Sequence, residues 1–149
     1  MTTIDTTLFS PAAIPLSPAR TTVLVVVAPL ETVFNHLANV ENLPRWAGDF
    51  CESIWLGREH WTALTALGEL FVVIEADAAA EEIVFCLGWN AAEFRRLSMT
   101  FSRCLEGTCL RFALAASADA TEARLFRALE AELPKLVTQL SATARWSDR

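Results

Sequence analysis

The sequence predicts an α+β domain in which a strongly curved antiparallel sheet of about seven strands wraps around one long C-terminal helix. Three observations predict this class. Residues 20–29 form a continuous β-branched run, residues 50–116 divide at turn residues into runs of strand length, and residues 119–140 carry an apolar stripe at helical spacing. Because the sheet has one apolar face, a helix is needed to cover it.

The first strand is expected over residues 20–29 and ends at Pro29. Pro29 suits the first turn of a helix, where the missing N–H is not needed. That helix places four apolar side chains on one face: Leu30, Val33, Phe34 and Leu37. His36 falls on its polar face, and we expect it in solvent. A second, very short helix is expected between Asn42 and Gly48, with Trp46 turned inward to close one end of the sheet.

The middle of the chain is expected to form six antiparallel strands. The last two, residues 95–103 and 108–115, alternate cleanly between apolar and polar side chains and are expected to pair through a turn at Glu106-Gly107. The strand at 69–76 is apolar on both faces, so its inward face stays open. Either Phe71, Val73 and Glu75 face inward, or the opposite set does: Leu70, Val72 and Ile74.

The C-terminal helix is expected to begin at the Asp119-x-x-Glu122 pattern, which is close to a capping box. Pro134 lies inside the predicted helix. Proline removes one backbone hydrogen bond and clashes with the carbonyl of Glu130, so a kink is expected. The apolar stripe consists of Phe126, Leu129, Leu133, Leu136, Val137 and Leu140.

Length and composition predict one domain at residues 20–149, out of 149 in total. Residues 1–19 are rich in Thr, Ser, Ala and Pro without a hydrophobic period, and predict an extended or disordered arm. Net charge −6 and a pI of about 4.9 argue against nucleic-acid binding, which needs clustered Lys and Arg.

The hydropathy pattern shows no apolar run long enough to span a bilayer, so integral membrane association is not expected. The N-terminal residues lack the basic and apolar pattern of a secretory signal, and a cytoplasmic protein is expected. The four cysteines show no Cys-x-x-Cys spacing and are expected as reduced thiols. No phosphate-binding glycine loop and no metal-ligand spacing occur, so no cofactor and no metal are expected.

Four stretches carry a resemblance to a known family. They are VLVVVAPLETVFNHLANVENLPRWAGDF (23–50), WTALTALGELFVVIEAD (61–77), EGTCLRFAL (106–114) and ALEAELPKLVTQL (128–140). Together they resemble the helix-grip fold of the START/Bet v 1-like (SRPBCC) superfamily, and most closely its bacterial polyketide cyclase/dehydrase and lipid-transport group. The resemblance implies a deep apolar cavity between the sheet and the long helix. It implies no catalytic residue, because those residues differ between subfamilies.

The resemblance and the aromatic content together predict binding of a hydrophobic small molecule, a lipid, aromatic or polyketide-like compound, in that cavity. The alternatives are an enzyme of the cyclase/dehydratase type and a protein-interaction module that uses the same groove. Acid–base chemistry would need Glu52, Glu75, His60 or Arg111 inside the cavity. The sequence does not identify the ligand, and it does not show whether a reaction is catalysed. A homodimer is possible. The residues expected to line the site are Trp46, Trp55, Trp61, Phe71, Glu75, Phe85, Met99, Phe101, Phe112, Phe126, Leu129, Leu133 and Val137.

Overall fold

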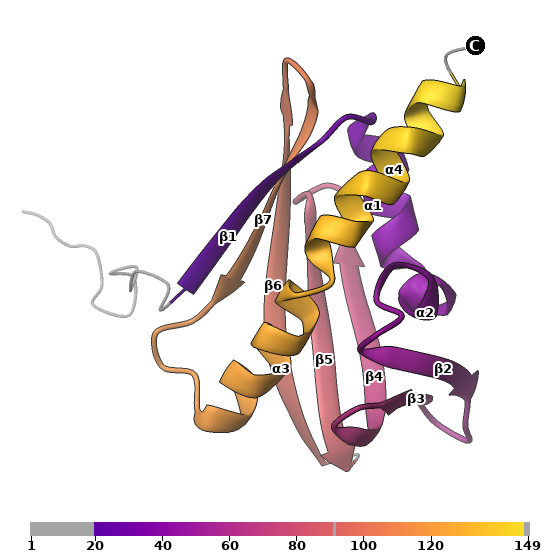
Figure 1. Cartoon of the computed structure of the whole chain (residues 1–149). Coiled ribbons are helices and arrows are strands. Elements are labelled where there is room, and N and C mark those ends of the chain that lie inside the picture. Colours follow the sequence, from indigo (N-terminus) through magenta and orange to yellow (C-terminus); the bar gives the residue numbers. More distant parts are fainter. Residues whose placement is uncertain (1–19, 91, 148–149) are drawn as a thin grey trace, which may run out of the picture.

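The computed structural model describes residues 20–90 and 92–147, with side chains described as far as Ser141 (Figure 1). The predicted arm at residues 1–19 lies outside the described residues. The elements follow the expected order of strand, helices, six strands and a C-terminal helical segment, which is divided into two helices. They are β1 (Arg20–Val26), α1 (Leu30–Ala38), the 3-10 turn η2 (Val40–Asn42), α2 (Leu43–Trp46), β2 (Cys51–Leu56), β3 (Trp61–Thr65), β4 (Gly68–Asp77), β5 (Glu82–Asn90), β6 (Glu93–Cys104), β7 (Gly107–Leu114), α3 (Ala120–Glu130) and α4 (Leu133–Ser147).

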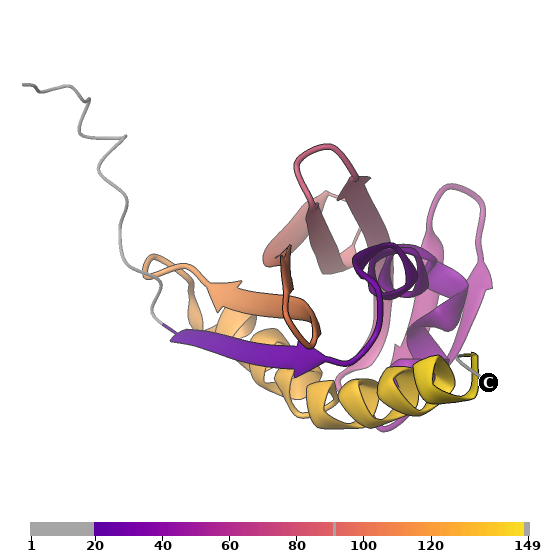
Figure 2. The same ribbon diagram turned by 90° about the horizontal axis from the view of Figure 1, so that it is seen from above.

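The strands form one seven-stranded antiparallel sheet in the order β1-β7-β6-β5-β4-β3-β2. Consecutive strands are neighbours except at β1, which pairs with β7 and aligns Arg20 with Leu114 and Val26 with Thr108. The strands curve around α1, while α3 and α4 run across the open side of the curve (Figure 2). The predicted α+β class, the seven strands and the helices between the first two strands are confirmed.

Burial along the strands identifies the face that packs against the helices. The cleanly alternating strands behave as predicted: Leu97, Met99 and Phe101 of β6 are buried, as are Leu110, Phe112 and Leu114 of β7. In β4 the open question is settled, because Leu70 and Val72 are 0% and 1% exposed. Phe71, Val73 and Glu75 therefore belong to the opposite face of the sheet.

The C-terminal helix is interrupted rather than kinked. The helix α3 ends at Glu130 and α4 begins at Leu133, so Pro134 lies in the first turn of a new helix. In that position the missing N–H of proline costs no helical hydrogen bond. The buried carboxylate of Glu132, at the break, accepts hydrogen bonds from the Lys135 ammonium at 3.1 Å and from the Asp49 amide at 3.4 Å. These bonds tie the break to the segment that precedes β2.

Three aromatic pairs hold the helices against the sheet. Phe112 of β7 stacks on Phe126 of α3 with ring centroids 4.5 Å apart, and Phe34 of α1 meets Phe101 of β6 edge-on at 5.4 Å. Trp46 of α2 contacts Phe85 of β5, with centroids at 5.9 Å. Such pairs add to the free energy gained by burying the rings, so α1, α2 and α3 each have an aromatic anchor on the sheet.

Candidate functional site

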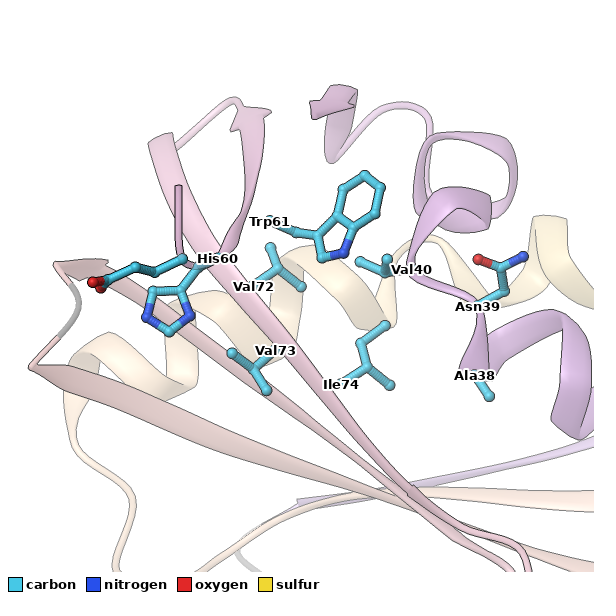
Figure 3. A pocket seen from close by; sticks show the side chains of 9 residues that line it. Ala38, Asn39, Val40, His60, Trp61, Val72, Val73 and Ile74 are labelled. Carbon is cyan, nitrogen blue, oxygen red and sulfur yellow. The ribbon is translucent and has the colours of Figure 1, made fainter. Parts of the chain in front are cut away.

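A groove of about 510 Å³ lies where the β3–β4 hairpin approaches the junction between α1 and η2 (Figure 3). One wall comes from β4, one from the end of α1 and from η2, and the start of β3 supplies an indole. Six of the lining residues are apolar and three are polar. The lining residues are Ala38, Val40, Trp61, Val72, Val73 and Ile74, with Asn39, Glu59 and His60.

Trp61 is the largest side chain of the groove. As the first residue of β3 it pairs with Leu56 on one side and Val72 on the other, so two strands fix its backbone. Its indole is partly buried and lies over Val40, Val72 and Ile74 (Figure 3). No described residue accepts a hydrogen bond from its ring N–H. The indole therefore offers the groove both an apolar face and a donor.

The apolar wall consists largely of side chains on the inward face of β4. Val72 and Ile74 face the same side as the buried Leu70, so they continue the core outward to the groove. Val40, in η2, is partly buried and packs against the same core. The groove is thus the open end of the apolar space between the sheet and the helices.

The polar end of the groove is formed by Glu59 and His60, which precede β3. The imidazole of His60 is held between two rings, with centroids 5.7 Å from Phe71 and 5.5 Å from Phe94. His60 and Val73 lie on the other side of the β4 ribbon from Trp61 (Figure 3). The groove therefore extends from one face of β4 to the other, and the imidazole at its rim is held in place by the two rings.

Most residues predicted to line a cavity lie in the packed core. Trp46 turns inward as expected, yet it is 1% exposed and fills space against Phe85. Val137 of α4 is partly buried, and it packs against the same core. Other core residues from the predicted set are also buried: Phe85, Met99, Phe101, Phe112, Phe126, Leu129 and Leu133. These side chains pack together rather than face the groove.

The remaining predicted residues lie on the surface, with one exception. Trp55 is 41% exposed, and Glu75 forms a 2.6 Å ion pair with Arg96 on the outer face. Phe71 contacts His60 from that same face. Trp61 is the one predicted residue that lines the groove. Sequence reasoning missed Ala38, Asn39 and Val40, because nothing in a helix end marks it as the wall of a groove.

Of the four candidate acid–base residues, only His60 lies at the groove. Glu52, Glu75 and Arg111 are exposed. His60 is half-buried and lines the groove beside Glu59. Burial raises the pKa of the Cys51 thiol to about 11 and also raises that of Cys86, so both are protonated at neutral pH. The described residues contain no cluster of His, Cys, Asp and Glu suited to a metal ion.

His36 departs from its expected solvated position. It is half-buried, and its Nε2 atom is buried without a hydrogen-bond partner among the described residues. Burial lowers the pKa of His36 below its ordinary value of 6.5, and the nearby positive charge of Arg45 lowers the pKa further. The folded protein therefore binds a proton at His36 less readily than the unfolded chain does.

This shift predicts a pH-dependent stability that His36→Gln removes. Above the unfolded-state pKa of about 6.5 His36 is neutral in both states, and its titration contributes nothing. As the pH falls below that value, the unfolded chain takes up the proton first, so the free energy of unfolding decreases until the folded-state pKa is passed. Urea denaturation in chloride buffers from about pH 8 to about pH 5.5 is expected to show a larger loss for the wild type. Parallel curves for the two proteins would contradict it.

The search of known proteins found similarity in structure and not in sequence. No protein-family model and no curated protein sequence matches the chain. The di-domain ARO/CYC StfQ from the steffimycin biosynthetic pathway superimposes with a TM-score of 0.62 and 20% identity over 83% of this chain, which spans 44% of the StfQ chain. The Aha1 dimer from Colwellia psychrerythraea gives 0.60 at 14% identity, covering 81% of this chain and 94% of that chain.

A third structure, the START superfamily protein from Mycobacterium smegmatis, gives a TM-score of 0.53 at 13% identity, over 85% of this chain and 97% of that chain. At these identities the likeness establishes the fold alone. The chain has the START-like (SRPBCC) helix-grip fold that the sequence resemblance predicted. Within the described residues, every helix is too short or too polar to cross a membrane.

Proposed function

We propose, from the START-like fold and the groove at Trp61, that this protein binds a small apolar molecule with a flat ring system. The single observation that carries the proposal is the continuous apolar wall of Val40, Trp61, Val72 and Ile74 around an open space. Its volume of about 510 Å³ falls within the usual range of small-molecule sites, roughly 300–1,000 Å³.

The chemistry of the wall favours an aromatic ligand over a fatty acyl chain. The indole of Trp61 presents a ring face, and β-branched side chains oppose it across the groove. A flat ligand inserted there would gain roughly 25 cal/mol for each Å² of apolar surface buried, and stacking adds to this. The ring N–H of Trp61 and the amide of Asn39 would orient a carbonyl or hydroxyl group of the ligand. The fold of StfQ, an ARO/CYC protein, supports an aromatic or polyketide-like compound.

We place the ligand in the groove and not deeper in the fold. Between the sheet and α3 the space is filled by Phe112 stacked on Phe126, and below α2 it is filled by Trp46 against Phe85. Entry of a ligand there would require displacing buried rings, each worth about 3–5 kcal/mol of core stability. The groove needs no such displacement.

The test uses N-phenyl-1-naphthylamine, a neutral aromatic probe whose fluorescence rises in apolar sites. Saturable binding by the wild type is expected, and Ile74→Glu, which brings a carboxylate onto the apolar wall, is expected to abolish it. Val25→Glu is the matched control, since Val25 is also a β-branched strand residue but is 43% exposed on β1. Thermal melts establish that both variants fold. Unchanged probe binding by Ile74→Glu, or none by the wild type, would overturn the proposal.

A second candidate function is acid–base chemistry on the bound molecule. The observation that favours it is His60, held at the groove rim between Phe71 and Phe94 with Glu59 beside it. An imidazole has one ring nitrogen that accepts a proton and one N–H that donates, and a dehydration requires both a base and an acid. Mass spectrometry of a β-hydroxyketone incubated with the protein would show loss of water. His60→Asn is expected to stop that turnover and to leave probe binding intact.

A further inference from the structure

A second hollow, of about 580 Å³, lies between α1, α2 and α4, and the proposed apolar groove does not include it. Its lining is polar where that of the groove is apolar. α1 contributes three polar side chains, η2 and α2 contribute two, and α4 contributes an amide and one leucine. The lining residues are Thr32, Asn35, His36, Asn42, Arg45, Gln139 and Leu140.

Hydrogen bonds between the helices fix the walls of this hollow. The side-chain amide of Asn42 donates to the carbonyl oxygen of His36 at 3.0 Å, which holds η2 against the end of α1. The side-chain amide of Gln139 donates to the carbonyl oxygen of Arg45 at 3.0 Å, which holds α4 against α2. Leu140, which is buried, contributes apolar surface. The hollow therefore has a set shape without any ligand.

The hollow carries the positive charge of Arg45 in a protein of net charge −6. The guanidinium of Arg45 forms no ion pair with a described residue, and no carboxylate is among the described lining residues. In contrast, Arg20, Arg95 and Arg96 each bind a carboxylate. A guanidinium presents paired N–H donors that match an oxyanion in a bidentate manner.

His36 supplies a second group that can donate a hydrogen bond to an anion. It lines the hollow, its Nε2 has no hydrogen-bond partner among the described residues, and burial together with the charge of Arg45 disfavours its protonated form. An anion placed between the two side chains would neutralise Arg45 and accept a hydrogen bond from a protonated imidazole. The anion would thus give the imidazole an acceptor and the guanidinium a counter-charge.

We propose that this hollow binds a small oxyanion, a carboxylate, sulfate or phosphate group, between the guanidinium of Arg45 and the imidazole of His36. The amides of Asn35 and Asn42 border the anion and limit its size. The site is separate from the apolar groove, and its occupancy does not depend on the proposed function of that groove.

The test titrates the wild type with sulfate, and then with phosphate and acetate, with chloride holding the ionic strength constant. Sulfate keeps its charge over the working pH range, so any pH dependence belongs to the protein. Saturable shifts of the backbone amide resonances of residues 35, 36, 42 and 45 are expected by NMR. Arg45→Gln is expected to weaken sulfate binding at least fivefold. Arg124→Gln, which removes the same charge from the exposed face of α3, is expected to leave binding unchanged.

The pH profile tests the role of His36. The described side chains that border the hollow with it are Thr32, Asn35, Asn42, Arg45, Gln139 and Leu140, and Arg45 is the one with a charge. Sulfate affinity of the wild type is expected to rise as the pH falls below about 6.5, and His36→Gln is expected to flatten this profile. Equal sulfate affinity in the wild type, Arg45→Gln and Arg124→Gln, or shifts spread over the whole surface, would overturn the proposal.

Phosphate and acetate separate the sources of the anion. Binding of phosphate and sulfate without acetate would indicate a tetrahedral dianion, and binding of all three would indicate any small oxyanion. Each outcome supports an oxyanion site and fixes its class. Binding of acetate alone would contradict the bidentate arrangement at Arg45, because a site built for charge is expected to favour the dianions.

Discussion

Replacement of Trp46 by alanine is expected to lower the free energy of unfolding by about 3–5 kcal/mol. The indole is 1% exposed and packs against Phe85, so its removal leaves a cavity that the short helix α2 cannot close. The loss combines the transfer of a large apolar side chain with the lost contacts of its neighbours. Urea denaturation followed by circular dichroism measures it.

The matched control is Trp55→Ala in β2. Trp55 is 41% exposed, so its replacement is expected to cost less than about 1 kcal/mol. Equal losses in the two variants would show that Trp46 is not the anchor of α2. A Trp46→Ala protein of wild-type stability that had lost probe binding would instead show that this indole lines a ligand site.

Replacement of Trp61 by alanine is expected to weaken binding of N-phenyl-1-naphthylamine at least tenfold, which corresponds to about 1.4 kcal/mol. The indole forms the large apolar face of the groove, and alanine removes both that face and the free N–H. Its effect on stability is expected to be smaller than that of Trp46→Ala, because Trp61 is only partly buried. Fluorescence titration with the probe measures the affinity.

Trp89→Ala provides the comparison for this second experiment. Trp89, at the end of β5, is 41% exposed and donates its ring N–H to the carbonyl of Leu67 at 3.0 Å. It does not line the groove. Its replacement is therefore expected to preserve probe affinity. A uniform loss of affinity in both variants would indicate binding through general exposure of apolar surface rather than at the groove.

The sequence predicted the parts of the fold that follow from a single periodicity. In β6 and β7 one face is apolar and the other polar, so burial could be inferred residue by residue, as Met99 and Phe112 show. In β4 both faces are apolar. There, the direction of Leu70 and Val72 depends on which face the helices cover, and that is decided by residues far along the chain.

The helix break also depended on context. Pro134 predicts a disturbance of the helix, but the same proline suits the first turn of a new helix equally well. At the break, the carboxylate of Glu132 is buried beside Lys135 and the backbone of Asp49. Asp49 is brought to the break by the tertiary fold, and its contact with Glu132 cannot be inferred from helical spacing.

The candidate site was the least predictable part. Trp46 and Trp61 are both indoles near a chain reversal, yet one fills the core and the other lines a groove. Whether an apolar side chain lines a cavity depends on how completely its neighbours fill the space, and composition does not determine this. His36 was expected in solvent but is half-buried, and the hollow that it shares with Arg45 depends on how α4 crosses α2.

The pairing of β1 with β7 has a consequence for synthesis of the chain. The first strand leaves the ribosome early, but its partner residues, such as Leu114 for Arg20, emerge only after five other strands. Until then the Val-rich strand β1 has no partner strand. Its addition to the sheet requires a contact between distant parts of the sequence. Val23 and Val25 stay about half exposed even in the finished sheet. Nascent chains halted before β7 are thus expected to be prone to aggregation, and the sheet is completed as one of the last folding events.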